Sequence, residues 1–196
     1  MPRTKQFDRD KVLKKAMDLF WKQGFHATSI QDLVNHLGIN RASMYDTFGG
    51  KDQLFQEAFQ YYQKENGRFF QNFEKLLAQK SARAVLEEFF ALELQSLKKD
   101  KESKGCMAVN VTTELSNQSE DIYQLVHSNK ERVTELFSQL IQTGQERDEI
   151  STQRPPEVIA RHLVTFFNGL KVISKIEKDP QRLKEIIDLE LEYIFH

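Results

Sequence analysis

The 196-residue sequence is poor in the residues that would tie it to several protein classes. Its single cysteine, Cys106, excludes an intramolecular disulfide framework. Only four prolines and eight glycines interrupt a chain in which 29% of the residues are charged, a composition that predicts an all-helical protein. No apolar run approaches the ~20 residues of a membrane span, and the N-terminal MPRTKQFDRD lacks the apolar segment of a secretion signal. We therefore expect a cytoplasmic protein in a reducing compartment, with no membrane association.

Catalytic signatures are missing as well. The sequence contains no P-loop, no glycine-rich dinucleotide fingerprint, no nucleophile elbow and no HExxH motif. The five histidines are scattered, without the spacing of metal ligands. We expect no enzymatic activity, no cofactor and no metal.

Charge is unevenly distributed along the chain. The net charge is −1, but residues 1–51 hold nine Lys or Arg against five Asp, so this segment carries +4 and the remainder −5. A basic N-terminal segment on an acidic remainder indicates that only the first part meets phosphate. Arg3 and Lys5 lie in a short basic arm, which is either a frayed terminus or a DNA contact.

The stretch from Thr28 to Lys51 has the pattern of two short helices and a tight corner. Four apolar residues recur with the spacing of one helix face: Ile30, Leu33, Val34 and Leu37. Thr28 and Gln31 are spaced as a capping box, and Gly38 suits the left-handed end of the helix. The pattern predicts a helix between Thr28 and Gly38.

A second short helix follows. Asn40 is a good N-cap, and Met44 and Phe48, four residues apart, are its inward side chains. The other side chains are mostly polar, so a hydrogen-bonding face points outward. A helix this short depends on its neighbours, and the pair is typical of a helix-turn-helix whose second helix enters a DNA major groove.

This stretch resembles the DNA-binding domain of the TetR family of bacterial repressors. The residues that carry the resemblance, without a gap, are Gly24, Phe25, Thr28, Ser29, Ile30, Leu33, Gly38, Ser43, Tyr45, Phe48, Lys51 and Leu54. Gly49-Gly50 departs from the family pattern, in which polar residues are more frequent there. The resemblance implies a dimer that binds a palindromic double-stranded DNA operator.

The resemblance also implies which residues contact DNA. Thr28 and Ser29, at a helix start, suit a phosphate oxygen, and Tyr45 matches a tyrosine that contacts phosphate. Lys51 opposes the helix dipole at its position unless a phosphate lies nearby. The set expected in or near the groove is Asn40, Arg41, Ala42, Ser43, Asp46 and Thr47. Asp46 has three open roles: accepting from a cytosine amino group, repelling phosphate, or capping.

The rest of the chain predicts a six-helix-type body. We expect a three-helix head over residues 1–50 and a ligand-sensing and dimerisation domain over 51–196. The expected helices run over about 8–24, 51–79, 81–97, 105–116, 119–143, 156–178 and 180–196, with N-caps at Asp8, Ser81 and Ser119 and a polar loop over 144–154.

The last two expected helices have apolar residues on more than one side. One stripe contains Ile159, Leu163, Phe166, Leu170 and Ile173, and a second contains Ala160, Val164 and Phe167. A helix this wide in apolar surface must bury two faces. Burial within one chain is one solution; the resemblance favours the other, a dimer formed through the last two helices, with the second stripe facing the partner.

Family bodies bind a small-molecule inducer. Residues that suit such a pocket are Phe69, Phe73, Phe89, Phe137, Phe167 and Lys171. The same rings also suit ordinary core packing. Lys171 can face the pocket or extend to solvent, and solvent is the commoner solution for a lysine there.

Cys106 follows a lysine-rich loop and a glycine at a predicted helix start. That setting lowers a thiol pKa and favours a thiolate. The segment GCMAVNVTTEL also resembles a TetR subgroup with a Gly-Cys pair, several of whose members respond to electrophiles or oxidants. A lone cysteine is also often a small buried hydrophobe. The sequence therefore predicts a repressor released by a small molecule or by modification of Cys106; the alternative is a helical protein-interaction module with a vestigial helix-turn-helix.

Overall fold

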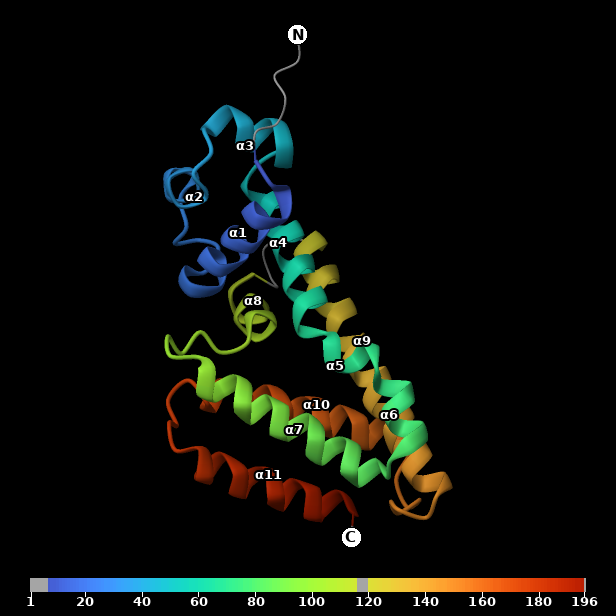
Figure 1. Ribbon diagram of the computed structural model, residues 1–196. Coiled ribbons are helices and arrows are strands. Elements are labelled where there is room, and N and C mark those ends of the chain that lie inside the picture. Colours follow the sequence, from blue (N-terminus) through green and yellow to red (C-terminus); the bar gives the residue numbers. More distant parts are fainter. Residues whose placement is uncertain (1–6, 116–119, 196) are drawn as a thin grey trace.

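The computed structural model describes residues 7–115 and 120–195, except for the side chains of Arg68 and Phe70. All regular elements in these residues are helices, which confirms the predicted fold class (Figure 1). In chain order they are α1 (Arg9–Gln23), α2 (Ile30–Leu37), α3 (Arg41–Phe48), α4 (Lys51–Asn66), α5 (Arg68–Gln71), α6 (Phe73–Gln79), α7 (Ala82–Lys99), α8 (Met107–Leu115), α9 (Glu120–Glu146), α10 (Pro156–Ile173) and α11 (Pro180–Phe195).

The head consists of α1 to α3, packed on the start of α4. Asp8 caps α1 by accepting from the N–H groups of Asp10 and Lys11, and those bonds hold the pKa of Asp8 below its usual range. Gly38 ends α2 at φ 69°, in the left-handed region where glycine is favoured. Asn40 caps α3 by accepting from Ser43 N at 2.8 Å. These three caps are as predicted.

The cap of α2 differs from the prediction by one residue. Ser29, not Thr28, is the N-cap, and its capping-box partner is Asp32 rather than Gln31. The Ser29 hydroxyl accepts from Asp32 N at 3.1 Å, while Asp32 Oδ2 accepts from Ser29 N at 2.9 Å. Thr28 and Ser29 each have a side-chain acceptor three positions later, in Gln31 and Asp32, so the sequence allows either as the N-cap. The bend of the chain after α1 places Ser29 in that position.

The expected helix over 51–79 is broken into α4, α5 and α6. Gly67 ends α4, with its N–H on the Gln63 carbonyl at 2.9 Å, and a Cβ there would lie only 2.7 Å from that carbonyl oxygen. Asn72 separates α5 from α6. Glycine weakens a helix interior enough for tertiary packing to redirect the chain at this point.

Two other boundaries of the body were wrong. The helix α9 continues to Glu146, so the expected polar loop is shorter, and Ile150 within it is buried against Gly144. The helix α10 ends at Ile173, where shorter turns take over, rather than near residue 178. Ser81 caps α7 as predicted, while the Ser119 cap and the arm with Arg3 and Lys5 lie outside the described residues.

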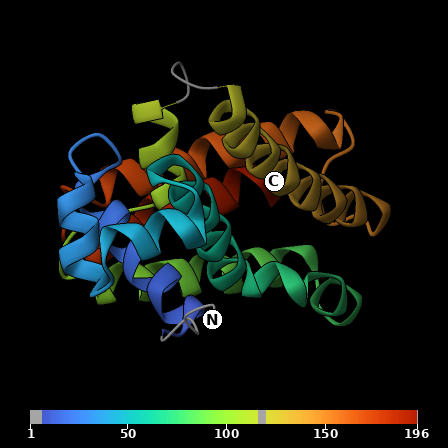
Figure 2. The same cartoon turned by 90° about the horizontal axis from the view of Figure 1, so that it is seen from above.

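Two hydrophobic cores organise these helices. The first core joins buried residues of α1 to α4 with Met107, Val111 and Leu115 of α8 and the first turns of α9. The second core is formed by α6, α7, α10, α11 and the remainder of α9. In Figure 1, α8 lies between the head and the layer of α7, α10 and α11. Seen from the head side in Figure 2, the head covers one end of the body, and α6 and the later turns of α9 extend beyond it. No helix in the described ranges is long and apolar enough to cross a membrane.

Candidate DNA-binding surface and regulatory site

The predicted reading residues share the outer face of α3. Arg41, Ala42, Tyr45 and Asp46 are exposed, and Ser43 and Thr47 are half-buried. The opposite face carries Met44 and Phe48, at 0% and 3% exposure, so packing against the head core fixes the rotation of the helix. Chain geometry thus collects the predicted groove contacts on one surface.

Three side chains at this face already make contacts within the chain. The Arg41 guanidinium lies 5.8 Å from the centroid of the Tyr45 ring, so the two form a neighbouring pair that combines a planar donor with a phenol. The Asn40 side-chain oxygen is used by the cap, which leaves its amide N–H groups as donors. Asp46 is exposed, and the contacts of α3 do not single out one of its three roles.

Thr28 has a structural role that the sequence did not reveal. Its side chain is fully buried; the hydroxyl donates to the Gly24 carbonyl at 2.6 Å, and its N–H donates to the Phe25 carbonyl at 3.2 Å. Neither group is available to a phosphate, so the predicted phosphate contact through Thr28 is wrong in this conformation. The residue closes the connection between α1 and α2 instead.

Ser29 stands at the start of α2, where a phosphate contact was predicted. Its hydroxyl donates to Asp32 Oδ2 at 2.6 Å, and this bond is the main reason that the pKa of Asp32 lies below its usual range. An ionised carboxylate therefore already occupies part of this helix end. The first-turn N–H groups of Ile30 and Gln31, which no helix can satisfy internally, are the remaining donors for a phosphate.

Lys51 is the first residue of α4, as predicted. Its ammonium group lies 4.2 Å from the centroid of the Phe25 ring, and Gly50 before it offers no side-chain cap. The aromatic face offsets part of the unfavourable interaction with the helix dipole. Gly49, at φ 78°, ends α3 in the left-handed region, so the turn that presents Lys51 suits glycine. The link between Lys51 and Phe25 was not foreseen because nothing local in the sequence relates them.

The phenylalanines predicted for a ligand pocket pack on one another. Phe89 lies 5.2 Å from Phe69, 5.4 Å from Phe137 and 5.1 Å from Phe167, measured between ring centroids. Phe73, Phe89 and Phe137 are at most 2% exposed. In this conformation the rings pack against one another in the second core. This arrangement corresponds to ordinary core packing, the alternative to a ligand pocket.

Lys171 is buried at 9% exposure, so the expectation that it extends to solvent is wrong. Its ammonium forms an ion pair with Glu93 of α7 and lies 5.0 Å from the centroid of the Phe167 ring. A cation so enclosed needs both partners to offset the loss of water. The partner could not be foreseen because Glu93 and Lys171 are 78 positions apart.

Cys106 lies immediately before α8 and is half-buried. Its sulfur is 3.4 Å from the hydroxyl of Tyr62 on α4, and burial is the main cause that raises the pKa of Tyr62. The neighbouring Gly105 carbonyl accepts from the indole N–H of Trp21 at 3.2 Å. Lys104, one of the lysines expected to favour a thiolate, instead lies over the Trp21 ring at 4.5 Å. The thiol is therefore placed where the body meets α1 and α4.

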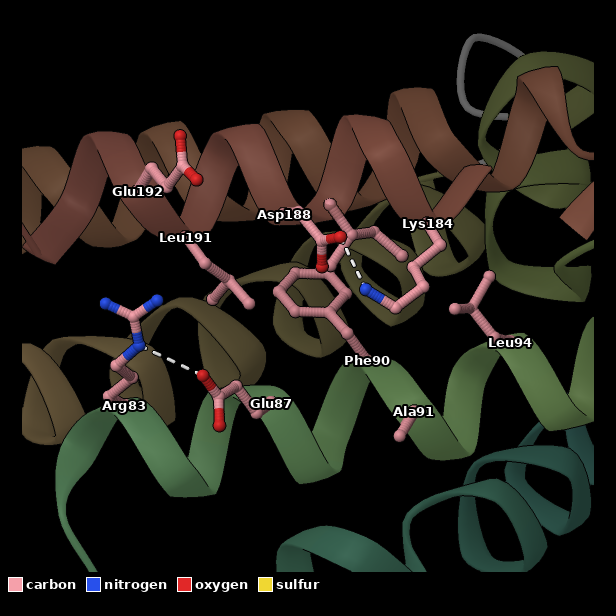
Figure 3. A pocket seen from close by; sticks show the side chains of 10 residues that line it. Arg83, Glu87, Phe90, Ala91, Leu94, Lys184, Asp188, Leu191 and Glu192 are labelled. Atoms are coloured by element: carbon pink, nitrogen blue, oxygen red, sulfur yellow. Dashed lines mark hydrogen bonds and ion pairs between the residues drawn. The ribbon is translucent and has the colours of Figure 1, made fainter. Parts of the chain in front are cut away.

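A groove of about 420 Å³ lies between α7 and α11, and Figure 3 shows the side chains that line it. Its floor is apolar and includes Phe90 and Leu191, and its rim is charged. Arg83 pairs with Glu87 across one turn, and Lys184 pairs with Asp188. Two further cavities, of about 340 and 310 Å³, lie at the end of α7 and between the head and α8. None of the residues predicted for the pocket lines these three spaces.

Apolar side chains on α11 and just after α10 are exposed in the single chain. Ile176, Leu189 and Tyr193 are 80%, 67% and 62% exposed. Val164, predicted to point outward, is buried at 6%, because the second stripe of α10 packs inside the protomer. Any apolar interface at this end must therefore use these exposed residues rather than the predicted stripe.

Comparisons with known proteins agree with this architecture. The family model described as "Bacterial regulatory proteins, tetR family" matches residues 12–58, and that described as "Tetracyclin repressor-like, C-terminal domain" matches residues 82–189. The transcriptional repressor ComR of Escherichia coli is 32% identical over 94% of this chain and 87% of its own. The uncharacterised regulator YezE of Bacillus subtilis is 28% identical over 97% and 98%.

A solved structure extends the likeness to a DNA complex. A cysteine mutant of the regulator CifR, bound to 26-base-pair operator DNA, is 26% identical and covers 98% of this chain and 99% of its own, with a TM-score of 0.86. The two family models together cover both the head and most of the body. This chain therefore belongs to the TetR family of DNA-binding transcriptional regulators.

Proposed function

We propose that this protein is a transcriptional repressor that binds a palindromic operator as a homodimer. The observation that carries the proposal is the outer face of α3, where Arg41, Ser43, Tyr45, Asp46 and Thr47 face away from the core. Donors at the start of α2 and the Lys51 ammonium flank this face and suit the DNA backbone. The full-length likeness to operator-bound CifR supports the same use of the head.

The dimer supplies the second reading head. A single head reads a few base pairs, and two-fold symmetry doubles the site, which is why an operator of this kind is an inverted repeat. The exposed Ile176, Leu189 and Tyr193 support an interface formed by α11 and the end of α10. Each of these apolar side chains gains from burial against a partner copy.

Release from DNA follows a change in the body. Two triggers are compatible with the contacts: a small molecule in the groove between α7 and α11, and modification of Cys106 by an electrophile with an activated double bond. In that addition the S–H bond breaks, the sulfur bonds to one carbon of the double bond, and the proton passes to the other. The second acts at the contact between Cys106 and Tyr62, and so on the helix that leads to the head. Similarity to a Gly-Cys subgroup of the family stays a prediction.

Selection of bound sequences from random double-stranded DNA tests the proposal. Wild-type protein, shown to be dimeric by light scattering, should enrich an inverted repeat. Cys106→Ser should enrich the same repeat and, if the thiol is the trigger, should no longer be released by an electrophile. Absence of any enriched symmetric sequence would contradict the proposed function, whereas normal release of Cys106→Ser would leave the groove as the site of control.

A further inference from the structure

One carboxylate of the body holds the main chain of the head. Glu114, near the end of α8, accepts from two successive backbone N–H groups: Phe25 N donates to Oε2 at 3.1 Å, and His26 N donates to Oε1 at 2.7 Å. Both oxygens of an ionised side chain are thus used on the connection between α1 and α2. Hydrogen bonds to a charged acceptor are stronger than neutral ones, and a paired geometry fixes orientation as well as distance.

The backbone of the head is shaped to admit this carboxylate. Gly24 adopts φ +83°, and a Cβ at that position would lie 2.9 Å from Glu114 Oε2. Glycine therefore serves twice here, because it adopts the left-handed conformation and leaves the space that Glu114 fills. The glycine at position 24 is an observation separate from the hydrogen bonds, and it indicates the same close approach of the Glu114 carboxylate to the head.

The segment that Glu114 holds supports both flanks of the DNA-binding surface. Thr28, next to the start of α2, bonds through its hydroxyl and its N–H to the carbonyls of Gly24 and Phe25. The Phe25 ring carries the Lys51 ammonium at 4.2 Å. A shift of residues 24–26 would therefore move the helix start that faces phosphate and the cation on the other side of α3.

We propose that Glu114 is a positioning residue for DNA binding, which sets the orientation of the head on the body through the N–H groups of Phe25 and His26. The proposal rests on the proposed function, because it specifies how that same surface is held. Two heads in a dimer must match half-sites about one helical turn apart, roughly 34 Å, so a small rotation of each head lowers operator affinity. The neighbouring bond from Trp21 to Gly105 belongs to the same junction but is neutral and single.

Three substitutions test the role of Glu114. Glu114→Ala removes both acceptors, Glu114→Gln keeps one acceptor oxygen but sets an amide N–H against a backbone donor, and Gly24→Ala places a methyl group where the carboxylate lies. Glu74→Gln is the matched control, because Glu74 is exposed on α6 and loses the same charge away from the head. Operator affinity is measured per binding-competent dimer, so that inactive protein does not count, and thermal unfolding is recorded for each variant.

Trp21 provides a readout that needs no DNA. It is the only tryptophan of the chain, and its half-buried indole lies at the junction between head and body. Exposure of an indole to water shifts its fluorescence emission to longer wavelength. A head that has lost the Glu114 contact should therefore show this shift in the free protein.

We expect Glu114→Ala and Gly24→Ala to lose at least tenfold in operator affinity, which corresponds to about 1.4 kcal/mol. Glu114→Gln should fall between them and wild type, the emission of Trp21 should shift in all three, and Glu74→Gln should match wild type. If binding-competent Glu114→Ala bound the operator with wild-type affinity, the proposal would be overturned. A loss explained fully by a smaller folded fraction would overturn it too, because Glu114 would then only stabilise the fold. If wild type selected no operator, the proposed function would fail. Separately, an unchanged Trp21 emission wavelength in Glu114→Ala would refute the role of Glu114 in holding the head.

Discussion

The two hydrophobic cores of this protein use their polar residues in opposite ways. The first core keeps the polar groups proposed for DNA binding outside, since Arg41, Tyr45 and Asp46 lie on the surface of a helix whose other face is buried. The second core encloses polar groups, as in the buried ion pair between Lys171 and Glu93. A surface that reads DNA must present its donors to a partner, whereas a charge enclosed in a core must be paired within the chain.

The seam between the two cores does not follow the predicted domain boundary. The body helix α8 contributes to the first core, because Met107, Val111 and Leu115 are buried there although they follow α7 in the chain. Cys106 and Glu114 bracket most of this helix and contact Tyr62 and the connection after α1. Division of the chain at residue 50 stays a prediction; α8 packs against α4 on the head side and against α9 and α10 of the body, so it lies at the junction of the two.

The largest expected effect tests whether the body phenylalanines are core. Phe137 is 0% exposed and packs on Phe89, so Phe137→Ala should lower the free energy of unfolding by about 3–5 kcal/mol. Tyr123, which is 41% exposed on the same helix, is the matched control, and Tyr123→Ala should cost far less. Urea unfolding measures both. A cost below about 1 kcal/mol for Phe137→Ala would mean that the ring lines a space rather than fills one.

A smaller effect tests the enclosed charges of the body. Lys171→Met leaves Glu93 without its cation and should cost about 3 kcal/mol, at the low end for a buried pair because Glu93 retains 22% exposure of its side chain. Adding Glu93→Gln should recover most of that loss, since the uncompensated charge is then gone. The same unfolding experiment decides. Equal stability of Lys171→Met and the double variant would show that the unpaired Glu93 charge is not what destabilises the protein.

Beside the outer face of α3, removal of the half-buried Lys51 cation should weaken binding to every sequence alike. If Lys51 contacts a phosphate as proposed, Lys51→Ala loses that contact, so the slope of log affinity against log salt should become shallower by about 1. Lys75→Ala removes an exposed lysine from α6 and is the control for net charge. Titrations at several salt concentrations measure both slopes. If Lys51→Ala changed the preferred sequence, Lys51 would act in base reading instead.

The smallest effect concerns pH at the junction of the two regions. The hydrogen bond from Lys22 holds the pKa of Glu102 below its usual range. A carboxyl whose pKa is lower when folded stabilises the protein above its unfolded value of about 4.3 and loses that contribution as the pH falls through the folded value. The melting temperature of wild type should therefore drop slightly more than that of Glu102→Gln between about pH 6 and pH 3.5. Parallel curves would show that the pair of Lys22 and Glu102 contributes no pH-dependent stability.

The head was predictable from sequence because its signals are local. Asp8, Gly38 and Asn40 act within four residues of their positions, and Met44 and Phe48 follow one helix period. The choice between Thr28 and Ser29 was not local, because it depends on how Thr28 folds back onto Gly24 and Phe25. In the body, phenylalanine suits a pocket and a core equally, so the sequence left both open.

Long-range partners were beyond the sequence for a related reason. Lys171 finds Glu93 78 positions away, and Glu114 finds Phe25 89 positions away. Periodicity reports which face of a helix is buried, but it does not report which helix lies opposite. The contacts that join body to head therefore appeared only with the fold.

Selection of operator sequences by wild type and Arg41→Ala in parallel tests whether the outer face of α3 reads the bases. If α3 reads bases and the flanks hold phosphate, the variant should keep the inverted repeat and lose preference at one symmetric pair of positions, at a cost of about 1–3 kcal/mol for a bidentate contact. An unchanged sequence preference in Arg41→Ala, or an asymmetric site for wild type, would contradict the assignment of this face as the DNA-reading surface.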